Sequence, residues 1–135
     1  MPFYRIYHPR HLFTPEDKAN IAKEFTRVHA SETGAPPFDV KVAFIELPLN
    51  SVFSGGEPEN SHIRVEGLIK GGRGPEVKKK ILEGLDKVLQ PWSKEGSIQT
   101  TLVEALSTDL VRHAGQFSSQ ESKNWAAGAP PQKFE

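Results

Sequence analysis

The most informative loop of the sequence is "KGGRGP", residues 70–75, which lies between a strand-like segment and a predicted helix. Lys70 and Arg73 are its two cations, and glycines separate and follow them. Free backbone N–H groups at a helix start, glycines that permit close approach and two positive side chains together favour an anion site. No phosphate-loop pattern G-x-x-x-x-G-K-[ST] occurs. A carboxylate fits this charge better than a polyphosphate, and a surface turn with solvated charges is the alternative.

The amino-terminal segment offers a second reactive group. The chain begins Met1-Pro2, and initiator methionine is usually removed when a small residue such as proline follows. We then expect Pro2 to carry a secondary amine, which can accept a proton. Residues 3–7, "FYRIY", are strand-forming types that would hold this terminus inside the fold. An α-amine titrates near about 8, and burial beside two cations disfavours its protonated form, so we expect a free base near neutral pH.

The histidines are the remaining candidates for chemistry. His29 falls on the apolar face of a predicted helix, where it is either a site residue or a core histidine satisfied by a backbone carbonyl. His8, His11, His62 and His113 do not form a metal-ligand set, and the chain has no cysteine. We therefore expect no metal site. The sequence also lacks the G-x-S-x-G motif of a serine nucleophile.

Composition limits the partners. Lys plus Arg is 17 and Asp plus Glu is 17, so the formal charge is zero, which argues against a nucleic-acid partner. No apolar run approaches the roughly 18 residues of a membrane span, and no signal peptide is recognisable. At 135 residues the chain is long enough for one domain with its own core. We expect a cytoplasmic protein that binds no membrane.

A strand–helix–strand pattern occurs twice along the chain. The first helix shows the start signals of Pro, Glu and Asp and an apolar stripe at helical spacing, and the second begins with Pro and Glu. Five of their residues recur at an offset of 60, namely Pro15, Glu16, Lys18, Ile21 and Val28. The expected elements are strands at 3–7, 38–47, 62–70 and 97–106 and helices at 14–34 and 75–90. Each half would be a right-handed crossover unit of parallel strands.

These elements predict an α+β fold in which two helices cover one face of a four-stranded sheet. The other face still carries apolar residues, and an uncovered face of that size usually marks an interface, so we expect a homo-oligomer. Residues 107–115 hold a short helical candidate, and 116–135 is interpreted as a C-terminal arm or disordered tail. The domain would span 1–115, with halves at about 1–60 and 61–106.

The starting proline, the tandem pattern and the cationic loop together resemble the tautomerase superfamily, specifically the group named for cis-3-chloroacrylic acid dehalogenase. The matching segments are "LFTPEDK", "VHASETG", "VAFIELPLNSVFSGG" and "EGLIKGGR". The resemblance runs from Pro2 to about residue 115. It implies a 4-oxalocrotonate tautomerase-like fold of tandem β-α-β units, assembled as a homotrimer. It also implies an amino-terminal proline at the base of a small carboxylate-binding pocket.

The resemblance assigns residues one by one. The family's proline is Pro2, its histidine is His29, and its pair of arginines falls on Lys70 and Arg73. Two positions depart from the family: its tyrosine of the last strand appears as Thr101, and the glutamate that activates water appears as Arg112. Loss of that carboxylate argues against efficient hydrolytic dehalogenation, because water addition needs a group to orient or deprotonate the water.

The function expected from these residues is that of a cofactor-free tautomerase acting on a small 2-oxo or enol carboxylic acid. Arg73, helped by Lys70, would hold the substrate carboxylate, Pro2 would be the general base, and His29 would bind polar groups of the substrate or the enolate oxygen. Three alternatives stay open. They are weak hydratase or dehalogenase activity on unsaturated acids, a catalytically idle oligomer that binds small carboxylates or another protein, and a binder of phosphate ligands.

Overall fold

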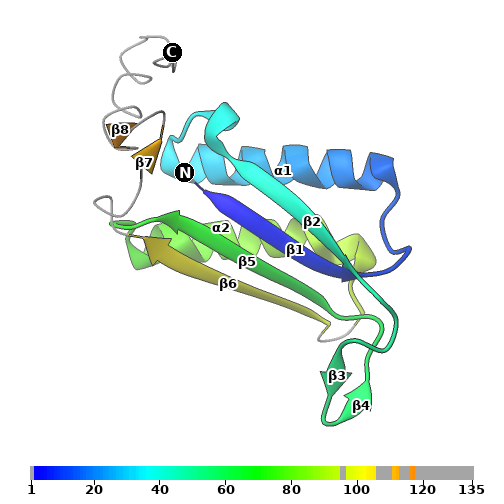
Figure 1. Cartoon of the computed structure of the whole chain (residues 1–135). Coiled ribbons are helices and arrows are strands. Elements are labelled where there is room, and N and C mark those ends of the chain that lie inside the picture. Colours follow the sequence, from blue (N-terminus) through cyan, green and yellow to red (C-terminus); the bar gives the residue numbers. More distant parts are fainter. Residues whose placement is uncertain (1, 95–96, 106–110, 113–115, 118–135) are drawn as a thin grey trace.

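A single mixed sheet forms the centre of the fold (Figure 1). The computed structural model describes residues 2–94, 97–105, 111–112 and 116–117. The sheet has the order β2-β1-β5-β6. Its strands are β1 (Phe3–Pro9), β2 (Lys41–Leu47), β5 (Ile63–Lys70) and β6 (Ile98–Ala105).

The sheet is built from two strand–helix–strand units. In the first unit, α1 (Pro15–Thr33) connects β1 to β2, and these two strands pair in parallel. In the second, α2 (Pro75–Leu89) connects β5 to β6, which are again parallel. The units meet where β1 pairs antiparallel with β5. Both helices cover the same face of the sheet (Figure 1). The predicted α+β fold of tandem β-α-β units is therefore confirmed.

The ends of α1 follow from local sequence. Thr14 caps its start, because the Thr14 hydroxyl accepts from the Asp17 N–H at 3.0 Å and the Asp17 carboxylate accepts from the Thr14 N–H at 2.9 Å. Pro15 takes the first helical position. Gly34 ends the helix with φ 74°, a left-handed conformation that glycine adopts without strain. These contacts fix where α1 begins and where it ends, one turn after His29.

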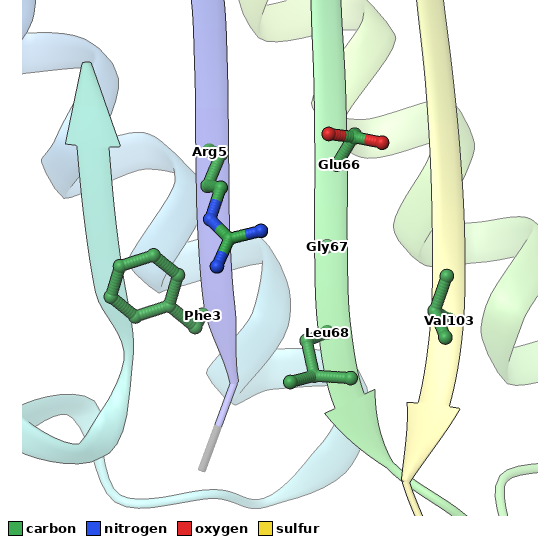
Figure 2. Close-up of a pocket in the computed structure, with 6 residues that line it drawn as sticks. All are labelled: Phe3, Arg5, Glu66, Gly67, Leu68 and Val103. Carbon is green, nitrogen blue, oxygen red and sulfur yellow. The ribbon is translucent and has the colours of Figure 1, made fainter. Parts of the chain in front are cut away.

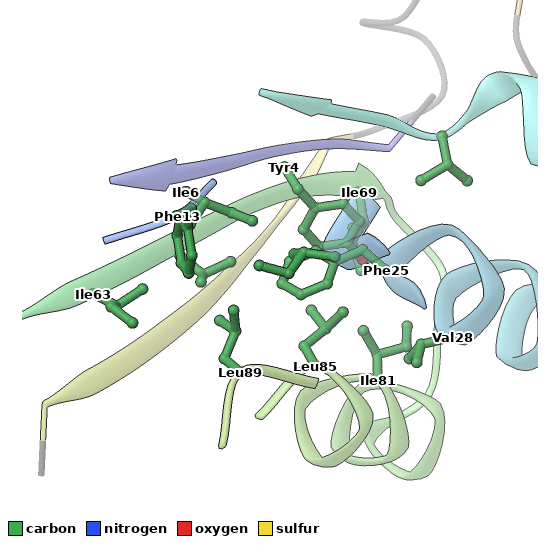
Figure 3. Packing of buried hydrophobic residues seen from close by; sticks show 13 residues of the cluster. Tyr4, Ile6, Phe13, Phe25, Val28, Ile63, Ile69, Ile81, Leu85 and Leu89 are labelled. Carbon is green, nitrogen blue, oxygen red and sulfur yellow. The ribbon is translucent and has the colours of Figure 1, made fainter. Parts of the chain in front are cut away.

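The core lies between the sheet and the two helices (Figure 3). Alternation along the strands turns every second side chain toward the helices, as in β1, where Tyr4 and Ile6 are fully buried. α2 contributes Ile81, Leu85 and Leu89 from one face. The other members of the buried apolar cluster are Phe13, Ile21, Phe25, Val28, Val40, Ile63, Val65 and Ile69.

The opposite face of the sheet, here called the open face, is covered by neither α1 nor α2, the two α-helices of the described residues (Figure 1). It holds a hollow of about 400 Å³ (Figure 2), lined by Phe3, Arg5, Glu66, Gly67, Leu68 and Val103. Leu68 and Val103 are apolar residues that remain 36% and 53% exposed there. The structure thus leaves an apolar sheet face uncovered in the single chain, as the sequence predicted.

Two 3₁₀ turns and four short strands complete the described secondary structure. Two 3₁₀ turns, η1 (Pro37–Asp39) and η2 (Gln90–Trp92), each follow one of the helices. The strands β3 (Phe53–Ser54) and β4 (Glu57–Pro58) form a hairpin that the sequence analysis did not predict. β7 (Val111–Arg112) pairs antiparallel with β8 (Gln116–Phe117).

Two predictions concern the C-terminal part of the chain. The helix expected at 107–115 is wrong at Val111–Arg112, because their backbone is extended in β7 and pairs with β8. The arm or tail expected at 116–135 lies outside the described residues except for Gln116–Phe117, and the division of the chain at residue 115 stays a prediction. No helix in the described part of the chain is long and apolar enough to cross a membrane.

Candidate functional site

One end of the sheet gathers polar and charged side chains from several elements. The start of β1, the last turn of α1, η1 and the loop before α2 meet there. We call this region the polar end and define it by Pro2, Tyr4, His29, Asp39 and Arg73. Two contacts tie its elements together: the Lys41 N–H donates to the Pro2 carbonyl at 3.0 Å, and the Arg73 Nη1 donates to the Thr33 carbonyl at 3.5 Å.

Pro2 lies at the very start of β1 and is buried. Its carbonyl is held by the Lys41 N–H, and the ladder continues with Phe3 opposite Lys41. These bonds fix the backbone of residue 2 beside the segment that joins η1 to β2. The amino-terminal proline is therefore anchored within the fold, as the strand-forming residues after it predicted.

His29 lies one turn before the end of α1 and is only 2% exposed. Its Nδ1 is 2.7 Å from the Tyr4 hydroxyl, and the two rings meet edge to face with their centroids 5.7 Å apart. Burial, assisted by the positive charge of Arg73, lowers the pKa of His29 from an ordinary 6.5 to about 4. The imidazole is therefore neutral at physiological pH and can donate one hydrogen bond and accept another.

Arg73 approaches His29 from the loop before α2. The side chain is half-buried and its Nη1 reaches the Thr33 carbonyl at the C-terminal end of α1. α1 has no basic residue in its own last turn, so Arg73 supplies the positive charge that favours a helix C-terminus. The Arg73 Nε is buried, and it has no hydrogen-bond partner within the described ranges. A guanidinium held at one nitrogen keeps further N–H groups for a planar anion.

The structure does not place the other predicted site residues on the helix-covered side of the sheet with Pro2, His29 and Arg73. Lys70 is the last residue of β5, and strand alternation turns it away from buried Ile69, toward the open face. Thr101 is exposed on the open face, in register with Glu66 of the neighbouring strand. The backbone of Arg112 belongs to β7, and its side chain lies outside what the structure describes. The single chain therefore brings together Pro2, His29 and Arg73.

Sequence reasoning missed two members of the polar end. Tyr4 looked like an ordinary strand residue, but its position two residues after Pro2 and its polar tip were a usable signal. Asp39 is 5% exposed in η1, and its negative charge raises the pKa of His29, against the larger lowering effects. A lone acidic residue in "GAPPFD" gave no sequence signal. Among the described residues, no group of three or more His, Asp or Glu side chains could hold a metal ion.

Residues 1–129 match the protein family described as "Putative oxalocrotonate tautomerase enzyme". The chain belongs to the oxalocrotonate tautomerase family. This match covers nearly the whole chain and confirms the tautomerase resemblance seen in the sequence. Members of this superfamily are usually enzymes. No curated protein matches the chain significantly.

Solved structures show the same fold at low sequence identity. N1, a member of the cis-3-chloroacrylic acid dehalogenase family, matches with a TM-score of 0.81 and 22% identity, over 95% of this chain and 92% of its own. RhCC from Rhodococcus jostii RHA1 matches with a TM-score of 0.76 and 24% identity, over 96% and 99%. A fused 4-OT asymmetric trimer matches with a TM-score of 0.79 and 21% identity, over 87% and 97%.

Proposed function

We propose that this protein is a cofactor-free tautomerase that interconverts the enol and 2-oxo forms of a small carboxylic acid, with the amine of Pro2 as general base. The observation that carries the proposal is the convergence of Pro2, His29 and Arg73 at one end of the sheet in a chain of this family. An enol–keto conversion needs a base, a carboxylate clamp and a donor for the developing oxyanion. The three residues supply one of each.

The proposed reaction is a proton transfer between oxygen and carbon. The Pro2 nitrogen takes the proton of the enol hydroxyl while the carbon–oxygen double bond forms, and the same nitrogen returns a proton to the adjacent carbon. Arg73 holds the substrate carboxylate through a two-pronged contact. Neutral His29 donates a hydrogen bond to the oxygen that bears negative charge in the transition state.

The proposal requires that Met1 is removed, because an acylated Pro2 nitrogen cannot accept a proton. Intact mass spectrometry of the purified protein tests this step directly. We expect the mass of a chain that starts at Pro2. Full enol turnover by protein that retains Met1 would overturn the role given to Pro2.

The activity test is ketonisation of an aryl enolpyruvate by the wild type and by Pro2→Ala. Loss of the cyclic amine should lower kcat/KM by about 100-fold or more, the lower range for a positioned acid–base group. Circular dichroism and light scattering would show whether the variant keeps its fold and oligomeric state. Equal rates for the two well-folded proteins would exclude the Pro2 amine as the base.

We further propose that the chain assembles as a homotrimer through the open face. The fused 4-OT structure is described as a trimer, and here the open face leaves Leu68 and Val103 exposed beside a hollow. Light scattering should then give three chains of 15.0 kDa, or about 45 kDa. Val103→Glu should lower that mass, because the contact would bury an unpaired charge. Lys79→Glu on the exposed side of α2 is the control and should leave it unchanged.

The alternatives from the sequence lead to different outcomes in the same assays. Saturable stabilisation by small carboxylates without turnover would favour an idle binding protein. Turnover of 3-substituted unsaturated acids that exceeds enol turnover would favour a hydratase or dehalogenase. Roles for Lys70, Thr101 and Arg112 stay predictions, and Thr101 lies on the face that a trimer would bury, so its role in a pocket would require a neighbouring subunit. The cytoplasmic location also stays a prediction.

A further inference from the structure

The polar end contains one fully buried group that the proposed reaction does not use, the phenol of Tyr4. Its side chain is 0% exposed, and its ring packs edge to face against Phe25 with centroids 5.6 Å apart. Burying a hydroxyl in an apolar core is unfavourable unless the hydroxyl finds a hydrogen-bond partner. The partner here is the Nδ1 of His29 at 2.7 Å.

The position of the Tyr4 ring depends on a glycine in the neighbouring strand. Gly67 lies opposite Tyr4 in the β1–β5 ladder. A Cβ at residue 67 would lie 2.6 Å from Cε1 and 2.8 Å from Cδ1 of the Tyr4 ring, and 2.9 Å from a methyl group of Leu102. Real Cβ atoms do not make such contacts, so a glycine is required for the ring to lie where it does. The sheet therefore holds the ring in one place under α1.

The hydrogen bond between Tyr4 and His29 has a direction that can be deduced. Burial raises the pKa of the Tyr4 hydroxyl above its ordinary value, so the hydroxyl keeps its proton. Within the described residues the hydroxyl has no other hydrogen-bond partner, and its proton is satisfied only by donation to a ring nitrogen with a free lone pair. Nδ1 of His29 is then the acceptor, and in a neutral imidazole the proton resides on Nε2.

We propose that Tyr4 is a positioning residue that holds His29 as the Nε2–H tautomer, so that the imidazole offers an N–H donor to the oxyanion of the substrate. The donor role rests on the proposed tautomerase function, whereas the tautomer itself does not. Without Tyr4 a neutral imidazole could place its proton on either nitrogen, and part of the protein would offer the substrate oxygen a lone pair instead of a donor. The buried Tyr4 hydroxyl, and Gly67 that leaves room for its ring, thus together keep the proton of neutral His29 on Nε2.

Charged groups from other elements also act on the His29 ring. Arg73 approaches from the loop before α2 and Asp39 from η1, with opposite effects on its pKa, and the amino group of Met1, in a chain that retains it, acts in the same direction as Arg73. These charges affect whether the imidazole is protonated. They do not choose between the two neutral tautomers, which is the task of the directional bond from Tyr4.

The direct test is nitrogen-15 NMR of the histidine side chains, since protonated and unprotonated ring nitrogens have well-separated shifts. In the wild type we expect Nδ1 of His29 unprotonated and Nε2 protonated, with the signal assigned by its loss in His29→Leu. His8 provides an internal reference of the opposite tautomer, because its Nδ1 lies 3.0 Å from the Pro9 carbonyl, which can only accept. This measurement needs neither substrate nor turnover.

The matched variants are Tyr4→Phe and Tyr7→Phe, which remove one hydroxyl each from opposite faces of the same strand. Tyr4→Phe should give a mixed His29 tautomer, a higher His29 pKa and an approximately tenfold lower kcat on an enol substrate, with little change in KM. Tyr7→Phe should change none of these. A purely structural role for Tyr4 would lower the melting temperature and leave the tautomer and kcat unchanged, which would overturn the proposal.

The outcomes separate this inference from the proposed function. An Nδ1–H tautomer in the wild type overturns the inference even if the protein is an active tautomerase. An Nε2–H tautomer that becomes mixed in Tyr4→Phe upholds the tautomer assignment, and absence of enol turnover by the same wild-type protein would then contradict only the proposed reaction and the donor role derived from it.

Discussion

The two ends of the helical layer hold one buried histidine each, and they use it differently. Each helix runs antiparallel to the strands of its own unit, and the two units are antiparallel to each other. The end of α1 therefore lies near the start of α2, at the polar end (Figure 1). The start of α1 and the end of α2 meet at the other end of the layer. We call this second region the aromatic end and define it by His8, Phe13, Phe44 and Trp92.

His8 is as buried as His29, at 1% exposure, but its ring lies among aromatic side chains, with the charges of Lys18 and Glu46 acting on it from further away. Phe13 and Phe44 pack around its ring at 4.8 and 6.1 Å, and Trp92 contacts Phe13 at 5.3 Å. Its Nδ1 donates to the Pro9 carbonyl, and its Nε2 has no partner within the described segments. Burial is the main cause that lowers its pKa. Burial and a lowered pKa are thus shared, and only His29 has a side-chain partner and a nearby guanidinium.

The internal repeat extends this comparison to the second unit. At the offset of 60, His29 corresponds to Leu89, which is 0% exposed at the end of α2, and Arg73 corresponds to Phe13. Arg73 contacts the carbonyl of Thr33, the last residue of α1, whereas Phe13 contacts Trp92, just beyond the end of α2. Equivalent places in the fold accept apolar residues at one end and polar ones at the other.

The largest expected effect is that of His29→Leu, which introduces the residue type found at the corresponding position of the second unit, Leu89. We expect kcat/KM on an enol substrate to fall by about 100-fold or more, because a donor to the oxyanion is lost. The free energy of unfolding should also fall, by about 1–3 kcal/mol, because the buried Tyr4 hydroxyl loses its hydrogen-bond partner. Steady-state kinetics and urea unfolding measure the two quantities.

His8→Leu is the control from the aromatic end, and it should leave kcat/KM within about twofold of the wild type. An equal loss of activity in both variants would mean that a buried histidine matters for packing at either end. The comparison between the ends would then fail.

The second prediction concerns the pH dependence of stability. Unfolded His29 binds a proton near its ordinary pKa of 6.5, whereas the folded protein resists protonation until about pH 4. Stability is therefore full above about pH 6.5 and falls as the pH drops toward 4, by about 3 kcal/mol from His29. His8 acts in the same direction, since its pKa is also lowered. Urea unfolding between pH 4 and 7.5 measures the loss.

The two leucine variants show how much of this acid-induced loss of stability each histidine causes. His29→Leu should remove the larger part of the loss and His8→Leu a smaller part. An unchanged slope in His29→Leu would show that carboxylates, and not the buried imidazole of the polar end, govern acid unfolding.

The third prediction addresses the guanidinium of the polar end. Arg73→Ala should lower kcat/KM for carboxylate substrates by about 30-fold, the scale of about 2 kcal/mol for a lost charged hydrogen bond, with Arg73→Lys in between. Arg27→Ala removes an exposed arginine of α1 that pairs with Glu24 at 2.8 Å, and it should leave kinetics unchanged. If Arg73→Ala also kept wild-type kinetics, the guanidinium would serve only the C-terminus of α1.

Much of the fold could be predicted because local signals agreed with the global pattern. Thr14, Pro15 and Gly34 marked the limits of α1, and alternation along β1 marked its buried face. The β3–β4 hairpin was missed although its signal was present. Gly55 and Gly56 have φ 57° and 85°, as the two-residue primed turns of hairpins require, and consecutive glycines are typical of such turns.

The candidate site was less predictable because it depends on which faces meet. Lys70 and Arg73 are three residues apart, but Lys70 ends a strand on the open face, and Gly72 with φ 90° lies between them, so Arg73 turns back toward α1. The pairing of Tyr4 with His29 needs the packing of α1 on β1, which residue spacing does not fix. Asp39 was missed because a 3₁₀ turn has no periodicity that reveals its buried side.

The smallest expected effect tests whether the polar end depends on the space above Gly67. Gly67→Ala should cost about 1–2 kcal/mol of stability, because its Cβ would overlap the Tyr4 ring. The displaced hydroxyl should also weaken its bond to Nδ1, so the His29 tautomer becomes mixed. Gly84→Ala is the control, since its Cβ would lie 2.6 Å from Val28 at the α1–α2 contact, away from Tyr4. Urea unfolding and histidine NMR should show destabilisation without a tautomer change for Gly84→Ala, and a tautomer change confined to Gly67→Ala. The same tautomer in all three proteins would mean that His29 keeps its proton on Nε2 without help from the sheet.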